Sequence, residues 1–578
     1  PYKIKPYHEI INDHYNTVDF DFELNQLISE RVSEMGTDGK FLPDQDEQIY
    51  YVALVEKLFV PMLVKFSNFI PEAGIWMNTQ RPEWNDANNA LVGNGASMVT
   101  LYYLRRYITF MKKLFQEIGR DQFSVSKEVH KFFDDIARAL DKFNCIVNGS
   151  ISDVDRRKFT DVLSTAGSDY RTSLYNNGFS GDKTNLSTED INSFLNNCLK
   201  HIDHSIKINE RKDHLFHAYN LIKFDENGGI SIRHFYEMLE GQVSVISSGY
   251  LSLKKSVVLL KALRNSSLYR VDQQSYILYP NRQLPHFYEK NIIPTALVNE
   301  SKVISRFLRE DQNNIIDIDV DGKIHFNSKF RNAGILKQEL QDINELSNQD
   351  IQEVLDIYEA IFDHQSFTGR SGTFFKYEGL GSIYWHMVSK LLLAVNDLYL
   401  SSNSDDEQLL TELKSIYYDI REGIGIHKNP GLYGAFPTDP YSHTPAHCGV
   451  QQPGMTGQVK EDYISRFGEL GVRISNGKIS FQPSLLEISE FIESDQNFIF
   501  YNIHGEKTTL PIKKNSLAFT LAQVPVIYTL SEQNSIRVNF NNNSVKEYDG
   551  LDLCKEVSNS VFNREGKVIK IEVNLIKV

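Results

Sequence analysis

The amino-acid sequence predicts a mainly α-helical protein that ends in a β domain. Over much of the chain, apolar residues recur at helical spacing, as in 48–66, 87–111, 351–362 and 408–421. From about residue 476, apolar and polar residues instead alternate, which is typical of half-buried strands. This change of period separates a helical part from a small C-terminal sheet or β-sandwich.

The same periodicity divides the chain into four zones. We expect residues 1–140 to be helical and residues 141–345 to be mixed, with insertions. Residues 346–475 return to helix and contain irregular loops, and residues 476–578 form the C-terminal β domain. A chain of 578 residues is long enough for two to four domains.

Two local patterns in the mixed zone predict loops and a hairpin. Residues 148–155 and 164–190 are rich in Asn, Ser and Asp, which favours surface loops. Residues 315–326 alternate around Asp321-Gly322, a strong hairpin signal. This segment also copies the first half of an EF-hand calcium loop, but its twelfth position is Ser328 instead of Glu. We therefore favour the hairpin and expect no metal.

Composition excludes several classes of protein. The net charge of -14 and the pI near 5.7 argue against a nucleic-acid binder. The 4 Cys are scattered, so they indicate neither a disulfide framework nor a zinc site. No apolar run reaches membrane-spanning length, and we expect a cytoplasmic protein without a membrane partner. Because the chain starts at Pro1, a processed or truncated N-terminus with an upstream signal remains an alternative.

The segment Arg81–Asn89 is a candidate acid loop. Trp84 lies two residues before Asp86. An aromatic face beside a carboxyl group raises the pKa of the carboxyl group, as a general acid requires. Trp84 can also stack on a sugar ring, and the Asn85 amide suits sugar hydroxyls. The alternative is an ordinary Asx-rich cap on the helix expected at 87–111.

A second candidate is the Gly-rich turn Gln451–Gly457, which precedes a helix expected at 458–467. Backbone N–H groups at a helix N-terminus bind anions, and the Thr456 hydroxyl adds a donor. The alternative is an ordinary N-cap. The preceding segment 436–447 contains three Pro and two His, which predicts an irregular, ordered loop.

A third candidate segment runs from Thr368 to Met387. Arg370 lies in a Gly- and hydroxyl-rich stretch that lacks the Lys spacing of a P-loop. Tyr377 and Glu378 follow in a loop, and His386 lies early in the next expected helix, 382–398. A single His on a mainly apolar helix face is more often a core residue than a ligand, but the polar loop before it favours a functional role.

The order of these motifs resembles the cellobiose and chitobiose phosphorylase family (glycoside hydrolase family 94), and even more the longer related β-1,3-glucan phosphorylases. The matching pieces are Trp84-Asn85-Asp86, the loop from Glu378 to His386, Tyr441-Ser442 and Thr456-Gly457. The resemblance implies an (α/α)6 barrel followed by a small β-sandwich. The family places a β-sandwich and the first half of that barrel before the acid loop, and residues 1–83 are too few for both. We therefore expect an N-terminal half of the same protein outside this chain.

The resemblance also implies roles for individual residues. Asp86 would be the general acid. Phosphate would be bound by His386, Thr456 and Gly457, with Gln452 or Gln451 in place of a family Gln. Residues near the substrate would be Trp84, Asn85, Glu378, Tyr377 and Arg370. Phosphate would attack the anomeric carbon with inversion, so inorganic phosphate is a co-substrate beside the oligosaccharide and no other cofactor is expected.

Two other functions remain open at this stage. An inverting hydrolase would need a second carboxylate as base, for which Glu461 is the candidate. The structural alternative for Glu461 is a first-turn Glu that complements the helix dipole. A non-catalytic carbohydrate-binding protein would keep the aromatic positions but would not need Asp86. Homodimerisation is also open.

Overall fold

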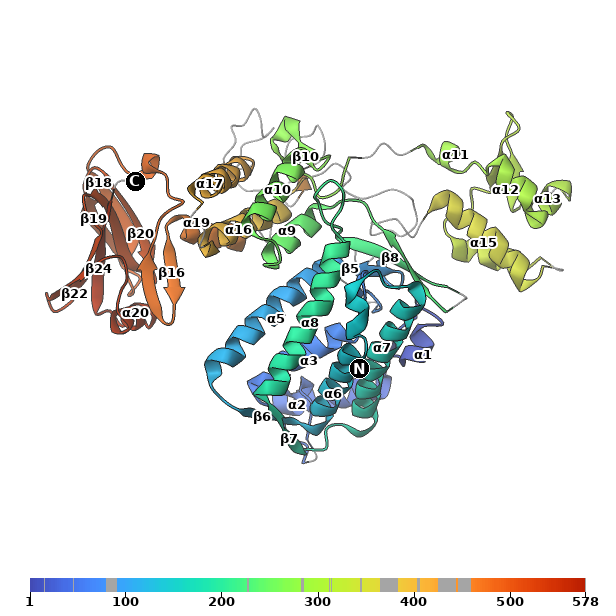
Figure 1. Ribbon diagram of the computed structural model, residues 1–578, viewed down its shortest axis with the longest axis horizontal. Coiled ribbons are helices and arrows are strands. Elements are labelled where there is room, and N and C mark those ends of the chain that lie inside the picture. The colour runs from blue at the N-terminus through green and yellow to red at the C-terminus, as the bar shows by residue number, and fades with distance from the viewer. Residues whose placement is uncertain are drawn as a thin grey trace. The chain divides into compact units, whose positions relative to one another are not determined.

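The computed structural model describes residues 1–14, 16–44, 46–79, 91–225, 228–281, 285–310, 312, 314–343, 346–363, 383–402, 406–424, 443–444 and 459–576. The chain divides into two units, one of residues 1–387 and 429–453 and one of residues 388–428 and 454–578. Figure 1 shows helices through most of the chain and strands toward its C-terminal end, so the predicted class, mainly α with a C-terminal β domain, is confirmed.

Long helices form the body of the first unit (Figure 1). They are α3 (Leu54–Phe66), α5 (Met98–Ile118), α6 (Lys127–Lys142), α7 (Asp153–Asn177) and α8 (Thr188–Ile208). α5 packs against α8, and α6 packs against α3 and α7. Aromatic side chains fill the space between them and are almost fully buried: Phe59, Phe66, Phe115, Phe132, Phe133, Phe159 and Phe194. Their burial supplies much of the hydrophobic stabilisation of this unit.

The prediction of a surface loop at 164–190 is wrong for most of that segment. α7 runs to Asn177 and α8 begins at Thr188, with the short strand β7 (Lys183–Ser187) between them. The buried face of α7 includes Ser164 and Gly167, small residues that leave only a faint apolar period in the sequence. They allow a close approach to Ser67, whose carbonyl oxygen accepts a hydrogen bond of 3.0 Å from the Ser164 hydroxyl.

A five-stranded sheet lies in the same unit, with strand order β3-β4-β5-β8-β9. The strands are β3 (Phe69–Ile70), β4 (Gly74–Trp76), β5 (Gly95–Ser97), β8 (Tyr219–Phe224) and β9 (Ile230–His234), and all neighbours pair antiparallel. The expected helix 87–111 therefore starts later: α5 begins at Met98, because the residues just before it form β5. The Ser97 side chain caps α5 by accepting from the Thr100 N–H.

Shorter elements complete the first half of the chain. They are β1 (Tyr2–Ile4), α1 (Tyr7–Ile10), β2 (Val18–Phe20), α2 (Phe22–Met35), β6 (Gln122–Ser126), α9 (Leu239–Ser247), α10 (Leu253–Arg264), β10 (Tyr269–Arg270) and β11 (Ser275–Tyr276). β6 pairs antiparallel with β7, and β1 with β2. Among the described residues, none of the helices combines the length and the apolar character needed to cross a lipid bilayer.

The segment from α11 to α15 has a hydrophobic core of its own. Its elements are α11 (Phe287–Lys290), α12 (Thr295–Glu300), α13 (Lys302–Arg309), β12 (Ile316–Ile318), β13 (Ile324–Phe326), α14 (Ala333–Gln341) and α15 (Asn348–Phe362). Core side chains between Ile293 and Phe362 come from this segment alone. The predicted hairpin is confirmed, since β12 and β13 pair antiparallel. The Asp319 carboxylate accepts from the N–H groups of Asp321 and Lys323, which fixes the turn.

The second unit joins helices to a β domain. α16 (Trp385–Ser401) has most of its length here and is followed by α17 (Glu407–Glu422) and α19 (Val459–Glu469). The strands are β16 (Val472–Ser475), β17 (Lys478–Phe481), β18 (Gln496–Tyr501), β19 (Lys507–Ile512), β20 (Ser516–Leu521), β21 (Val524–Ser531), β22 (Ser535–Phe540), β23 (Val545–Asp549) and β24 (Val568–Ile576), with α20 (Lys555–Phe562) before the last. The strand order β20-β21-β24-β22-β23 makes a five-stranded sheet in which β21 and β24 run parallel.

A buried ion pair fixes the turn between β3 and β4. The Glu72 carboxylate lies 2.5 Å from the Arg156 guanidinium, and both side chains are about 5% exposed (6% and 5%). Glu72 has a φ of 65°, a conformation uncommon for a non-Gly residue. Burial favours a higher pKa for Glu72, but hydrogen bonds from His204, Arg156 and the Ile151 N–H bring the pKa below its ordinary value. The carboxylate is therefore charged and well satisfied.

We expect Arg156→Met to lower the free energy of unfolding by about 3–5 kcal/mol, because it leaves the Glu72 charge buried without its main partner. Arg138→Met is the control, since Arg138 pairs with Asp135 at the surface and its side chain is 72% exposed. Its loss should cost about 0–1 kcal/mol. Urea unfolding followed by far-UV circular dichroism measures both, and equal losses would contradict the structural role of the pair.

Candidate functional site

The structure describes only part of the set of residues selected from the sequence. His386 and Glu461 lie within the described residues. The others fall outside them: Trp84, Asn85, Asp86, Arg370, Tyr377, Glu378, Gln452, Thr456 and Gly457. The assigned roles of all these residues stay predictions. For the segments outside the described residues, the structure shows the residues that flank them on either side.

The chain on either side of the acid loop is held together by hydrogen bonds. The Met77 N–H donates to the Gly95 carbonyl at 2.9 Å, and the Gly93 N–H donates to the Met77 carbonyl at 2.7 Å. The indole N–H of Trp76 also donates to the Gly93 carbonyl, at 2.8 Å. The described residues on either side of the segment that contains Asp86 therefore lie side by side at the edge of the β4–β5 pair.

Gly74 allows β4 to approach β5 closely. Its φ is 119°, and a Cβ at this position would lie 2.7 Å from the Ser97 carbonyl group. Only glycine fits such a backbone conformation and distance without strain. The turn held by Glu72 and this close approach together set the direction of β4, the strand that leads into the acid loop.

A cavity with a volume of about 270 Å³ lies beside the ends of this loop. Its lining includes Trp76, Asn78 and Thr79 on one side of the loop sequence and Val92 on the other. The Asn78 amide donates to the Asn68 side-chain oxygen at 2.7 Å, and the Thr79 hydroxyl to the Asn78 oxygen at 3.2 Å. Amide and hydroxyl groups therefore face a small cavity at the point where the acid loop begins.

His386 follows a short strand that joins two of the segments singled out in the sequence. β14 (Ile383–Tyr384) pairs antiparallel with β15 (His443–Thr444), with Tyr384 opposite His443. The Pro- and His-rich segment 436–447 therefore meets the segment that ends at His386. His386 is the second residue of α16, and its Nδ1 lies 3.3 Å from the Tyr384 hydroxyl.

Glu461 lies in the first turn of α19 and is buried, with 5% of the residue exposed. Its carboxylate oxygen Oε1 lies 3.9 Å from Lys460 Nζ. Nearby polar atoms that the sequence did not single out are Ser389 Oγ, Asp462 Oδ1 and Ser465 Oγ. They are buried and form no hydrogen bond of normal geometry among the residues that the structure describes, although the Ser389 hydroxyl is close enough to Asp462 to lower its pKa. Buried polar atoms of this kind usually bind water or a ligand. This polar cluster directly follows the predicted phosphate turn in the sequence.

Glu469, two turns further along α19, has a structural role. Its carboxylate accepts from the Tyr417 hydroxyl at 2.7 Å and lies 2.9 Å from Arg421 Nε and 2.6 Å from Arg466 Nη1. These contacts join α17 to α19. Since both carboxylate oxygens are already paired, Glu469 is not available as a catalytic base in this arrangement.

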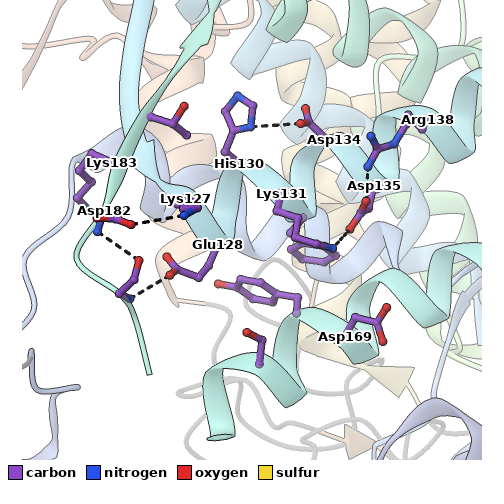
Figure 2. Close-up of a pocket in the computed structure, with 15 residues that line it drawn as sticks. Lys127, Glu128, His130, Lys131, Asp134, Asp135, Arg138, Asp169, Asp182 and Lys183 are labelled. Atoms are coloured by element: carbon purple, nitrogen blue, oxygen red, sulfur yellow. Dashed lines mark hydrogen bonds and ion pairs between the residues drawn. The ribbon is translucent and has the colours of Figure 1, made fainter. Parts of the chain in front are cut away.

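A second cleft, of about 1080 Å³, lies along α6 and α7 (Figure 2). It is lined by many charged side chains, but these pair with one another. Lys131 and Arg138 both contact Asp135, at 2.7 and 2.5 Å, and His130 lies 3.3 Å from Asp134. The charges of this cleft are thus largely compensated within the protein.

Residues 284–365 match the family model described as GH149 phosphorylase insertion domain 2. The matched segment coincides with α11 to α15 and their separate core. No curated protein sequence matches the chain. The match confirms the resemblance to the glycoside phosphorylases related to glycoside hydrolase family 94, and it indicates an enzyme of the glycoside phosphorylase type.

Asp462 offers a pH test of the polar cluster. Burial raises its pKa above the ordinary value, the Ser389 hydroxyl opposes this, and the Glu461 charge adds to it. Because the folded chain holds the proton more tightly than the unfolded chain, stability falls as pH rises from 3.8 through the raised pKa. Asp462→Asn should therefore raise the stability at pH 7 by up to about 1 kcal/mol after solvent screening, and the gain should vanish below the ordinary aspartate pKa.

Thermal unfolding of wild type and Asp462→Asn between pH 3 and 8 measures this difference. Asp495→Asn is the control, because Asp495 is exposed, and the hydrogen bond from the Lys514 N–H together with the Lys513 ammonium lowers its pKa. That variant should lose stability at neutral pH. A loss for Asp462→Asn at pH 7 would show that the Asp462 charge is compensated in the folded protein.

Proposed function

We propose that this chain belongs to an inverting glycoside phosphorylase that acts on β-linked gluco-oligosaccharides, with β-1,3-glucan favoured. The observation that carries the proposal is the phosphorylase insertion-domain match at 284–365, in the same chain as the Trp84-Asn85-Asp86 motif. The helical part then belongs to an (α/α)6 barrel, with the β domain after it. Inorganic phosphate is the co-substrate.

In the proposed reaction, Asp86 donates its proton to the glycosidic oxygen while a phosphate oxygen attacks the anomeric carbon from the opposite face. The C–O bond to the leaving sugar breaks as the new C–O bond to phosphate forms, giving a sugar 1-phosphate with inverted configuration. Phosphate is its own nucleophile and needs no second carboxylate, unlike water in an inverting hydrolase. His386, Thr456 and Gly457 bind the phosphate, with Gln452 beside them.

The surroundings of the loops support this proposal. A general acid must be held within hydrogen-bond reach of the leaving oxygen, and the hydrogen bonds among Trp76, Met77, Gly93 and Gly95 tie down both ends of the loop that contains Asp86. The β14–β15 pairing joins the segment of His386 to the segment of Tyr441 and Ser442. Substrate contacts from Trp84, Asn85, Arg370, Tyr377 and Glu378 are part of the proposal.

The reaction is tested by incubating β-1,3- and β-1,4-gluco-oligosaccharides with the longest form of the protein, with and without inorganic phosphate. We expect sugar 1-phosphate only when phosphate is present. Asp86→Asn should lower kcat by about 10²–10⁴-fold, and the exposed control Asp38→Asn should not. Release of free sugar without phosphate would instead identify a hydrolase, in which Glu461→Gln should abolish turnover.

The phosphate site is tested by His386→Ala. Loss of a hydrogen bond to a charged group costs about 1.5–3 kcal/mol, so the KM for phosphate should rise about 10–100-fold while the KM for the oligosaccharide changes little. His8→Ala is the control, because His8 is exposed, with 79% of its side chain accessible. An unchanged KM for phosphate would remove His386 from the phosphate site.

A further inference from the structure

Arg171 differs from the other arginines of α7 in its lack of an acidic partner. Arg156 contacts Glu72 and Asp153, and Arg157 lies 2.7 Å from Asp161. Arg171 Nε is buried and has no hydrogen-bond partner, and no carboxylate of the described residues pairs with its guanidinium. Burial lowers the pKa of Arg171, and only the Tyr175 hydroxyl opposes this. A mostly buried, unpaired cation is costly, so its presence calls for a compensating anion.

Arg171 lines the 270 Å³ cavity beside the acid loop. Lys65 lines it as well, and no lining residue that the structure describes carries a carboxylate. The remaining polar lining comes from amides and hydroxyls, including Asn68, Asn78 and Thr100. The cleft in Figure 2 is different, since there each cation has a nearby carboxylate.

These features match the requirements of an oxyanion. A guanidinium can donate two parallel N–H bonds to a phosphoryl group, and a Lys ammonium adds a second point charge. Asn and Thr side chains supply neutral hydrogen bonds that fix orientation. The cavity is several times larger than a single water molecule needs, so it can hold a phosphoryl group together with a small attached group.

We propose that this cavity binds a phosphoryl oxyanion, either inorganic phosphate or the phosphoryl group of a sugar phosphate, with Arg171 and Lys65 as its cationic ligands. The site is distinct in its residues from the phosphate site proposed at His386, Thr456 and Gly457. The inference does not depend on that site. A bound anion would join α7 to Asn78 and Thr79, the residues that lead into the acid loop, and would make the position of β4 sensitive to phosphate.

The test counts phosphate ions bound per chain by equilibrium dialysis with radiolabelled inorganic phosphate. Wild type and Arg171→Met are compared in a His386→Ala background, which weakens the other proposed site. We expect Arg171→Met to lower the remaining phosphate affinity at least tenfold. Arg157→Met is the matched control, because it removes a charge from the same helix but one that is paired with Asp161, and its phosphate binding should be unchanged.

Stability without phosphate gives an independent readout. Arg171→Met should leave the thermal midpoint unchanged or raise it, since an unpaired buried charge is removed. Arg157→Met should leave it unchanged or lower it slightly, because the pair that it breaks is partly exposed and Asp161 keeps its hydrogen bond from the Tyr7 hydroxyl. Phosphate should raise the midpoint of wild type more than that of Arg171→Met. If Arg171→Met does not fold, Arg171→Lys keeps the charge but loses the paired N–H donors, and it should bind phosphate several-fold more weakly.

Glucose 1-phosphate as a competitor identifies the source of the phosphoryl group. Competition that depends on Arg171 would assign a sugar phosphate, whereas Arg171-dependent binding of inorganic phosphate without competition would assign the free ion. Phosphate binding that is the same in Arg171→Met and wild type would overturn the proposal. A clear loss of stability in Arg171→Met without phosphate would also overturn it, because Arg171 would then have a partner within the fold.

Discussion

The buried ion pair of Glu72 and Arg156 is the interaction on which the geometry around the acid loop depends. It holds a residue with a left-handed backbone at the turn between β3 and β4. The Glu72 N–H donates to the Ser205 hydroxyl, the Asn209 amide donates to the Glu72 carbonyl, and His204 Nε2 lies 3.1 Å from the carboxylate. A non-Gly residue in this conformation carries strain that the surroundings must offset. Because β4 continues directly into the acid loop, any rotation of this turn would move the loop entrance.

The network also links distant parts of the chain to this turn. The Asn209 side-chain oxygen accepts from the Asn220 amide on β8, and the Asn220 oxygen lies 2.8 Å from His234 Nδ1 on β9. α7, α8 and the sheet thus meet through polar groups at the turn, while the phenylalanines between the helices supply the apolar packing. Polar networks of this kind are stabilising only when each member is satisfied, which explains why so many hydrogen bonds converge on one carboxylate.

The sequence predicted the C-terminal β domain best. Several of its strands alternate in burial, and the segments expected at 478–481, 524–530 and 535–540 are strands in the structure. The hairpin at 315–326 was equally clear, because Asp321-Gly322 specifies its turn. α7 was missed, since its buried face uses Ser164, Gly167 and Arg156, which carry no apolar period. Helical wheels detect apolar stripes and not the close packing of small residues.

The candidate site was predictable only in its motifs. Trp84-Asn85-Asp86 and Thr456-Gly457 are local patterns with a chemical meaning, whereas Arg171 and the Ser389–Asp462–Ser465 cluster depend on contacts between residues far apart in the sequence. The buried charge of Arg171 is not visible in a helix that also contains Arg156 and Arg157, because only the folded structure shows that two of the three have acidic partners.

The cations of the two cavities differ in whether carboxylates lie near them, and this difference bears on which cavity can bind an anion. Where α6 and α7 border the larger cleft, each cation lies near a carboxylate, so the surface there has little to gain from a charged ligand. Arg171, on the same helix α7, lines the cavity beside the acid loop instead, and no carboxylate of the described residues lines that cavity. For the proposed anion site this lining is favourable, because a carboxylate in that cavity would both repel the anion and compete for the Arg171 guanidinium.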